Sequence, residues 1–292
     1  MSLVRTNTVP TDKEDMSLDL NIGWKDRERE KIGLNARCSP SMQDYSSYGK
    51  ELVEVLSVRY KGQGDPSCTI IVYDGKRGQI IYTQSGQGDM RVSHEHSNSG
   101  TQNGSNDRRL LLTGPYRVIS MDGCVLIEYN IDDHCHAKIL LDIDDPSTKH
   151  DEAVTAELGC TCDNHPKAVV TYALLSNAVE AIVEVKLHQR RDNTFYGTII
   201  AYSYLGDVVL FETDNEKTLI GSSQEPTIIP LARSVLAVPL DSSLQIEVDL
   251  WNHSNGKIVK GLVSCQAHLN SNHVVHLDGE NGQVDVKITW SD

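Results

Sequence analysis

Residues 179–187 read VEAIVEVKL, and apolar side chains occupy every second position. One side of the extended chain would carry Val179, Ala181, Val183, Val185 and Leu187, and the other would carry Glu180, Glu184 and Lys186. Because successive side chains of a β-strand point to opposite faces, this period of two predicts a strand with one buried face and one wet face.

The same alternation recurs in LQIEVDL at 244–250 and VDVKITW at 284–290. Shorter strand candidates fill the chain from residue 50 onward: Leu52–Tyr60, Cys68–Tyr73, Gln79–Thr83, Lys138–Asp142, Val169–Leu175, Thr194–Tyr204, Val208–Glu212, Val235–Val238, Ile258–Cys265 and His273–Leu277. Turn dipeptides that favour positive φ lie between strands: Asp74-Gly75, Asp122-Gly123, Asn255-Gly256, Asp278-Gly279 and Asn281-Gly282. Many short strands without a strongly amphipathic helix predict an all-β fold, an antiparallel β-sandwich or barrel-like domain.

One hairpin is predicted more specifically than the rest. Tyr116–Ser120 and Cys124–Asn130 have strand character, and the turn Met121-Asp122-Gly123 separates them. We therefore expect these two strands to pair with each other.

The chain divides into a tail and a domain. Residues 1–48 show no regular apolar period beyond a short helical pattern in Trp24–Leu34, so we predict a polar and mostly disordered N-terminal tail. Residues 49–292 form the predicted all-β domain. Within it, residues 85–107 are rich in Gly, Ser and Asn and nearly lack apolar side chains, which predicts a surface insertion.

Charge and composition exclude several classes of partner. The chain has 27 Lys and Arg against 41 Asp and Glu, a formal net charge of -14, which argues against nucleic-acid and anionic-membrane binding. No stretch approaches the roughly 18 apolar residues of a membrane span, and residues 1–16 lack the apolar segment that we would expect of a secretory signal. The seven cysteines are odd in number and widely spread. We therefore expect a cytoplasmic or nucleocytoplasmic protein with reduced thiols.

Three segments carry a family resemblance. They are RLLLTGPYRVISMDGCVLIEYNID at 109–132, SLQIEVDLWNHSNGKIVKGLVSCQAHLN at 243–270 and VDVKITWSD at 284–292. Together they resemble a grass-enriched plant family, a domain of unknown function found alone or behind ribosome-inactivating N-glycosidase domains. The resemblance covers about residues 50 to 292 and implies a role in plant stress or defence. It implies no functional residues, because none are established for the family.

The first candidate site is a zinc cluster. His134 and His136 would lie on the same side of an extended strand, and Cys160-Thr161-Cys162 supplies two thiolate ligands. Zinc takes four nitrogen or sulfur ligands, so these two pairs would complete a site if the fold brought them together. The Cys-x-Cys spacing is not that of a usual zinc knuckle. The alternative is a polar loop with ordinary thiols, and a bound cofactor is not expected.

The second candidate is carboxylate catalysis by Asp142, Asp144 and Asp145. Glycosidases use two acids across a cleft, but acids at strand ends are usually solvated, and Asp145-Pro146 is typical of a turn. The common nucleophile, phosphate-loop and dinucleotide motifs do not occur. The Glu-Ala-Ala-Arg run of the N-glycosidases is absent too, so we do not expect that activity.

The sequence leaves open whether Trp251 and three tyrosines are exposed or buried. Trp251 follows the wet face of its strand, and Tyr196, Tyr202 and Tyr204 alternate along another. They would either form a binding surface or pack within the core.

The favoured hypothesis for the function is a non-enzymatic interaction module that binds a protein partner through a sheet edge or the loops. The alternative is a hydrolase or carbohydrate-active protein with an acidic or zinc site near residues 132–165.

Overall fold

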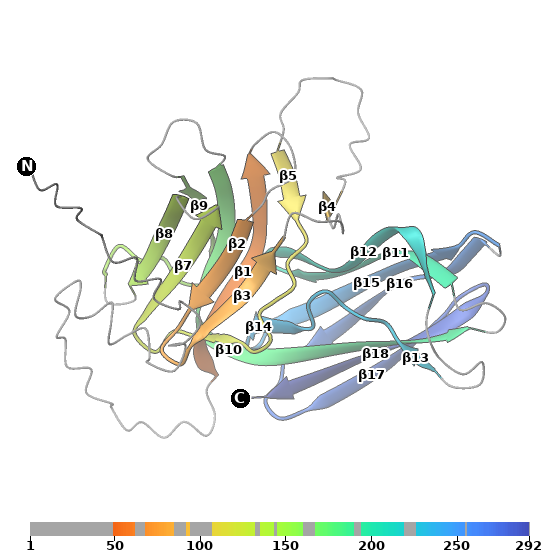
Figure 1. Ribbon diagram of the computed structural model, residues 1–292. Coiled ribbons are helices and arrows are strands. Elements are labelled where there is room, and N and C mark those ends of the chain that lie inside the picture. The colour runs from red at the N-terminus through yellow and green to blue at the C-terminus, as the bar shows by residue number, and fades with distance from the viewer. Residues whose placement is uncertain are drawn as a thin grey trace, which may run out of the picture.

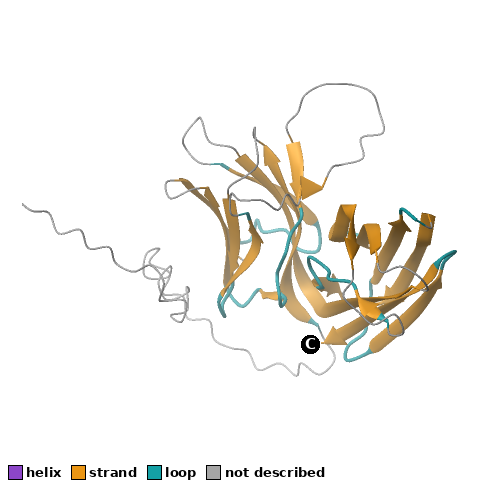
Figure 2. Ribbon diagram, turned by 45° about the vertical axis from the view of Figure 1, so that its right-hand side comes forward, coloured by secondary structure: helices purple, strands orange, loops and turns teal. Residues whose placement is uncertain are grey.

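A computed structural model of the protein describes residues 49–61, 68–84, 92–93, 107–131, 135–142, 145–159, 167–189, 194–218, 226–254 and 256–291. Within these ranges the regular structure consists of antiparallel β-strands (Figure 2), which confirms the predicted fold class. No helix in the described ranges has the length and apolarity to span a membrane. The predicted tail, 1–48, and most of the predicted insertion, 85–107, lie outside the described residues.

The strands form three sheets, which we call A, B and C (Figure 1). Sheet B has the order β3-β2-β7-β8 and consists of β2 (Cys68–Tyr73), β3 (Gly78–Thr83), β7 (Cys124–Ile131) and β8 (Cys135–Asp142). Sheet C has the order β12-β11-β15-β16 and consists of β11 (Thr194–Ser203), β12 (Gly206–Thr218), β15 (Ser243–Asn252) and β16 (Gly256–Gln266).

Sheet A is the largest and connects the two halves of the molecule. Its main order is β17-β18-β10-β1-β5-β4, from β1 (Lys50–Lys61), β4 (Val92–Ser93), β5 (Asp107–Leu110), β10 (Lys167–Gln189), β17 (Asn272–Asp278) and β18 (Gly282–Ser291). Four shorter strands join it: β6 (Ile119–Ser120) on β1, and β9 (Ala153–Leu158), β13 (Thr227–Ile228) and β14 (Val235–Pro239) on β10.

Strand β10 changes partners halfway along its 23 residues. Its first half, up to Ala178, pairs with β1 and β9, and its second half pairs with β14, β13 and β18. The first half thus closes one sandwich with sheet B, and the second half closes another with sheet C (Figure 1). We call these the first and second sandwich.

The residue pattern of β10 follows from what covers each face. Ala168, Val170, Tyr172 and Leu174 belong to the core of the first sandwich, whereas Ala173, Leu175, Val179, Ala181, Val183, Val185 and Leu187 belong to the core of the second. The junction is covered on both faces, so the sequence there is almost continuously apolar. Beyond it one face is wet, and the sequence alternates.

Two expectations about connectivity were wrong. The segments Val169–Leu175 and Val179–Leu187 are one strand rather than two. The expected hairpin between Tyr116–Ser120 and Cys124–Asn130 does not form, because β6 pairs with β1 in sheet A and β7 pairs with β2 and β8 in sheet B. Met121 in the connecting turn is fully buried, so the turn passes between two layers instead of reversing within one.

The predicted turn conformations hold at some glycines and fail at others. Gly123 and Gly256 have positive φ, as expected. Gly279 and Gly282 do not; at Gly279 a Cβ atom would overlap the carbonyl oxygen of Ile258. Glycine there permits a close approach of backbone rather than an unusual dihedral angle.

Candidate functional site

The residues of the zinc hypothesis are only partly described. His136 lies on β8 with an exposed side chain, and its Nδ1 is 2.7 Å from Oδ1 of Asn130 on the paired strand β7. His134, Cys160 and Cys162 lie outside the described residues. Among the residues that are described, no group of three or more His, Cys, Asp or Glu side chains is placed to hold a metal ion. The zinc site stays a prediction, which the zinc content of protein purified without chelator would test.

One of the acidic candidates, Asp145, stabilises a turn. Asp145 is exposed, and its Oδ1 accepts hydrogen bonds from the backbone nitrogen (2.8 Å) and hydroxyl (2.7 Å) of Ser147. Its carbonyl accepts one from Thr148 N at 2.9 Å, so the predicted turn at Asp145-Pro146 is confirmed. Asp142 ends β8 half-buried, and Asp144 lies outside the described residues.

A different group of polar residues surrounds the segment that carries the family motif. We call residues 113–118, TGPYRV, the Tyr116 turn; it connects the region of β5 to β6. Its backbone is fixed at the start by a hydrogen bond from Thr113 N to Ile81 O at 2.9 Å. A Cβ atom at Gly114 would lie 2.5 Å from the carbonyl oxygen of Ile80, so the turn lies directly on strand β3. The Gly114-Pro115 peptide bond is cis.

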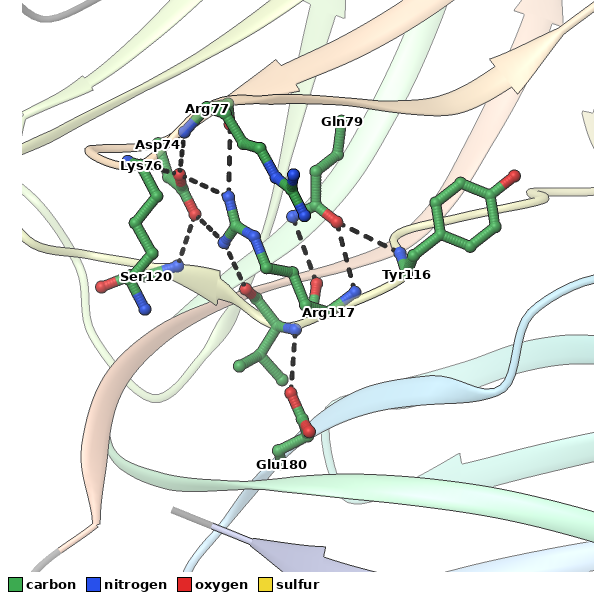
Figure 3. A network of polar contacts seen from close by, with 9 residues as sticks. Asp74, Lys76, Arg77, Gln79, Tyr116, Arg117, Ser120 and Glu180 are labelled. Atoms are coloured by element: carbon green, nitrogen blue, oxygen red, sulfur yellow. Dashed lines mark hydrogen bonds and ion pairs between the residues drawn. The ribbon is translucent and has the colours of Figure 1, made fainter. Parts of the chain in front are cut away.

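Asp74 is the centre of the network that supports this turn (Figure 3). It follows β2 and is 1% exposed. Its two carboxylate oxygens accept a bidentate pair of hydrogen bonds from Arg117, at 2.5 and 2.9 Å. Three backbone amides also donate to it: those of Lys76 (2.8 Å), Arg77 (3.1 Å) and Ser120 (3.1 Å).

These contacts set the charge state of Asp74. Burial acts to raise the pKa of its carboxyl, but the hydrogen bonds from Arg117 and from the three amides outweigh burial and hold the pKa below its usual value. Asp74 is therefore an anion at neutral pH, matched by the Arg117 guanidinium in the geometry that suits this pair best. A paired and fully hydrogen-bonded carboxylate of this kind fixes its neighbours in one arrangement.

Gln79 supports the other side of the turn. Its side chain is 7% exposed, and its Oε1 accepts hydrogen bonds from the backbone nitrogens of Tyr116 (3.1 Å) and Arg117 (3.2 Å). Its Nε2 donates to the carbonyl of Arg117 at 3.2 Å. Val118 N donates to Oε2 of Glu180 on β10 at 3.2 Å, which connects the turn to the long shared strand (Figure 3).

The side chain that this scaffold presents is Tyr116. It is 77% exposed, and in Figure 3 it points away from the network that fixes its backbone. The adjoining Ile80 is 46% exposed. The turn therefore offers an aromatic and an aliphatic side chain on a backbone that hydrogen bonds hold in place.

Sequence reasoning missed this site because each of its members has a common explanation. Asp74 precedes a glycine and was interpreted as turn chemistry, although its side chain is buried. Gln79 shares the inward face of β3 with Ile81, and this polar residue at a buried position was the available signal. The partner, Arg117, lies 43 positions after Asp74, a separation that no local pattern reveals.

The fold and the site together define an all-β protein of two β-sandwiches, with an exposed turn whose backbone is held by hydrogen bonds. The family model of a domain of unknown function, DUF6598, matches residues 52–288, and the chain belongs to that family. The sequence-based expectation that this chain contains a domain of unknown function is thus confirmed.

Comparisons with other proteins give weak likenesses. No curated protein matches the sequence. The paired C2 domains of extended synaptotagmin 2 align with 88% of this chain and 96% of their own, at 8% identity and a TM-score of 0.27. Human GIVD cytosolic phospholipase A2 aligns with 84% of this chain and 33% of its own, at 9% identity and a TM-score of 0.22.

Proposed function

We propose that this protein is a non-enzymatic interaction module that binds a protein partner through the Tyr116 turn. The observation that supports the proposal is the combination of a 77% exposed tyrosine with a backbone held by Asp74, Gln79 and Arg117. Tyrosine is enriched among the residues that dominate binding energy at interfaces. A backbone that is already ordered loses little conformational entropy when a partner binds.

The proposed setting is plant stress or defence, in the cytoplasm. This part rests on the sequence resemblance to a grass-enriched family, and on the acidic net charge of -14, which disfavours nucleic acids and anionic membranes as partners. The absence of recognisable nucleophile and phosphate-binding motifs supports a binding role over a catalytic one.

Photo-crosslinking from the turn tests the proposal directly. Protein carrying Tyr116→p-benzoylphenylalanine is irradiated in plant-cell extract, and the adducts are identified by mass spectrometry. We expect a discrete polypeptide adduct. Binding of the purified partner should weaken about thirtyfold in Tyr116→Ser, the loss expected for a residue that dominates an interface.

The matched control is Tyr204, a second tyrosine with 61% exposure that lies in the turn between β11 and β12. Tyr204→p-benzoylphenylalanine should not produce the same adduct, and Tyr204→Ser should bind the partner as wild type does. If both positions gave the same adducts, or if Tyr116→Ser bound the partner with unchanged affinity, the turn would not be the binding site.

A further inference from the structure

The outer face of sheet C carries a second group of ordered polar and aromatic side chains. We define the aromatic–acidic face by Tyr196, Thr198 and Tyr202 of β11 and by Glu247, Asp249 and Trp251 of β15. These residues point outward because their sequence neighbours, among them Ile199, Val248 and Leu250, are fully buried in the core. Register places Tyr196 opposite Trp251 and Thr198 opposite Asp249, so the two strands form one continuous strip.

Trp251 is fixed within this strip by Asp249 and Lys257, and Lys260 in turn holds Asp249. Its Nε1 donates to Oδ1 of Asp249 at 2.5 Å, and the other oxygen of Asp249 accepts from Lys260 Nζ at 2.6 Å. The Lys257 ammonium lies 5.9 Å from the centre of the indole ring. The indole is half-buried and held in one orientation, as a preorganised binding surface requires.

The two tyrosines of the strip are held as well. Tyr196 stacks on His253 with ring centroids 4.6 Å apart. The Tyr202 hydroxyl donates to Oε2 of Glu247 at 2.9 Å. Burial, together with the nearby Glu247 and Asp207 carboxylates, raises the pKa of Tyr202 to about 12, so its ring stays neutral at physiological pH.

The chemistry of the strip points to a neutral, hydroxyl-rich ligand. Asp249 and Glu247 each accept one or two hydrogen bonds, and a carboxylate has about four acceptor positions, so both retain capacity for further donors. Lys257 and Lys260 offset the charges of these two acids, so the charges described in the strip do not favour an ionic ligand. A protein partner is disfavoured too, because charged residues are depleted from the centres of protein interfaces.

We propose that the aromatic–acidic face binds a neutral oligosaccharide. The flat C–H face of a pyranose ring packs against indole and phenol rings, and its hydroxyls donate to carboxylates and accept from lysine ammonium groups. Tyr196 to Tyr202 spans roughly 20 Å of strand, which is longer than one sugar ring and suits a chain of several. The aromatic–acidic face shares no residue with the Tyr116 turn or with residues 132–165, and this proposal does not depend on the function proposed above.

Affinity electrophoresis tests this proposal with defined probes: xylan, xyloglucan, mannan and mixed-linkage β-glucan. We expect one or more of these polysaccharides to retard the wild-type protein. Trp251→Ala should weaken the retardation at least about tenfold, and Tyr196→Ala should do the same, so that a folding defect in one variant does not decide the result. Tyr202→Phe keeps the ring and loses the hydroxyl, and its effect should be smaller.

Val274→Ser is the control, because it changes an exposed side chain on β17 of sheet A, outside both proposed sites, and it should be retarded like wild type. Circular dichroism confirms that each variant is folded. The proposal is wrong if none of the four polysaccharides retards the wild-type protein, or if folded Trp251→Ala and Tyr196→Ala are retarded normally. It is also wrong if Trp251→Ala abolishes capture of a polypeptide while no polysaccharide binds, because the face would then be a protein interface.

Discussion

The buried carboxylate of Asp74 accepts hydrogen bonds from two segments of the chain, residues 76–77 and residues 117–120. Asp74→Asn keeps the shape of the side chain but removes the charge that pairs with Arg117, whose side chain is 21% exposed. We predict a loss of about 2 to 3 kcal/mol in the free energy of unfolding at neutral pH, measured by urea denaturation. Asp278→Asn changes an exposed carboxylate on β17 and should cost less than about 0.5 kcal/mol.

The pH dependence of this effect has a defined sign. Because the pKa of Asp74 is lower in the folded protein than in the unfolded chain, its contribution to stability is present above the unfolded value and is lost as the pH falls through the folded one. The difference between wild type and Asp74→Asn should therefore be largest near neutral pH and shrink below about pH 4. A difference that stayed constant down to about pH 2 would show that charge pairing is not its cause.

The Tyr116 turn could be predicted only in part from the sequence. The sequence motif around Tyr116 was recognised, but it was assigned to a hairpin strand. The hydrogen bonds that hold this segment as a turn come from Asp74, which follows β2, and from Gln79 on β3, and both are distant from Tyr116 in the sequence. Periodicity reports which face of a strand is buried; it does not report which side chains from different strands meet.

At the scale of elements, strand positions were predicted well and strand partners were not. The alternation in β15 and β18 is reproduced in the burial of these strands, since each has one core face and one wet face. The alternation in β10 was recognised too, but its apolar first half was interpreted as a separate strand. A continuous apolar run is compatible with a short buried strand or with part of a long one, and only the two cores on either side of it distinguish these cases.

Strand β11 contains a glycine whose replacement should disturb the aromatic–acidic face. Gly197 has φ of 129° at a register irregularity between Phe195 and Gly197, and a Cβ atom there would overlap the carbonyl oxygen of Asp249. We predict that Gly197→Ala lowers the free energy of unfolding by about 2 to 4 kcal/mol, because the alanine would need both an unfavourable φ and a shift of β15. Denaturant unfolding measures the loss.

Gly256→Ala separates the two causes. Gly256 also has a positive φ, 78°, but no atom lies within 4 Å of the position of its Cβ. This variant should cost only about 1 kcal/mol, the penalty of the dihedral angle alone. Equal losses in the two variants would mean that contact with Asp249 contributes nothing at Gly197.

At the scale of the whole molecule, several contacts besides β10 hold the two sandwiches together. Arg109 of β5 pairs with Asp207 of β12, which joins a strand of the first sandwich to sheet C. Glu54 of β1 pairs with Arg233, the residue two positions before β14, and both side chains are almost completely buried. The second oxygen of Glu54 accepts a hydrogen bond from Ala237 N at 2.6 Å, and Arg233 donates to Val55 O at 2.7 Å. We expect the sandwiches to unfold as one cooperative unit.

Breaking this buried ion pair should destabilise the entire molecule. Arg233→Met leaves the Glu54 carboxylate without its partner, which should lower the free energy of unfolding by about 3 to 5 kcal/mol at about pH 7.5. Burial already raises the pKa of Glu54 in the wild type, and loss of the guanidinium removes an interaction that opposes this shift. A folded-state pKa above the unfolded value makes stability fall as the pH rises from the unfolded pKa to the folded pKa. The loss should therefore be smaller at about pH 5 than at about pH 7.5.

The double variant Glu54→Gln/Arg233→Met buries no unpaired charge. It should regain more than half of the lost free energy of unfolding and show no such pH dependence. If the double variant were as unstable as Arg233→Met near neutral pH, the unpaired charge would not be the cause, and the lost hydrogen bond to Val55 O would be the better explanation.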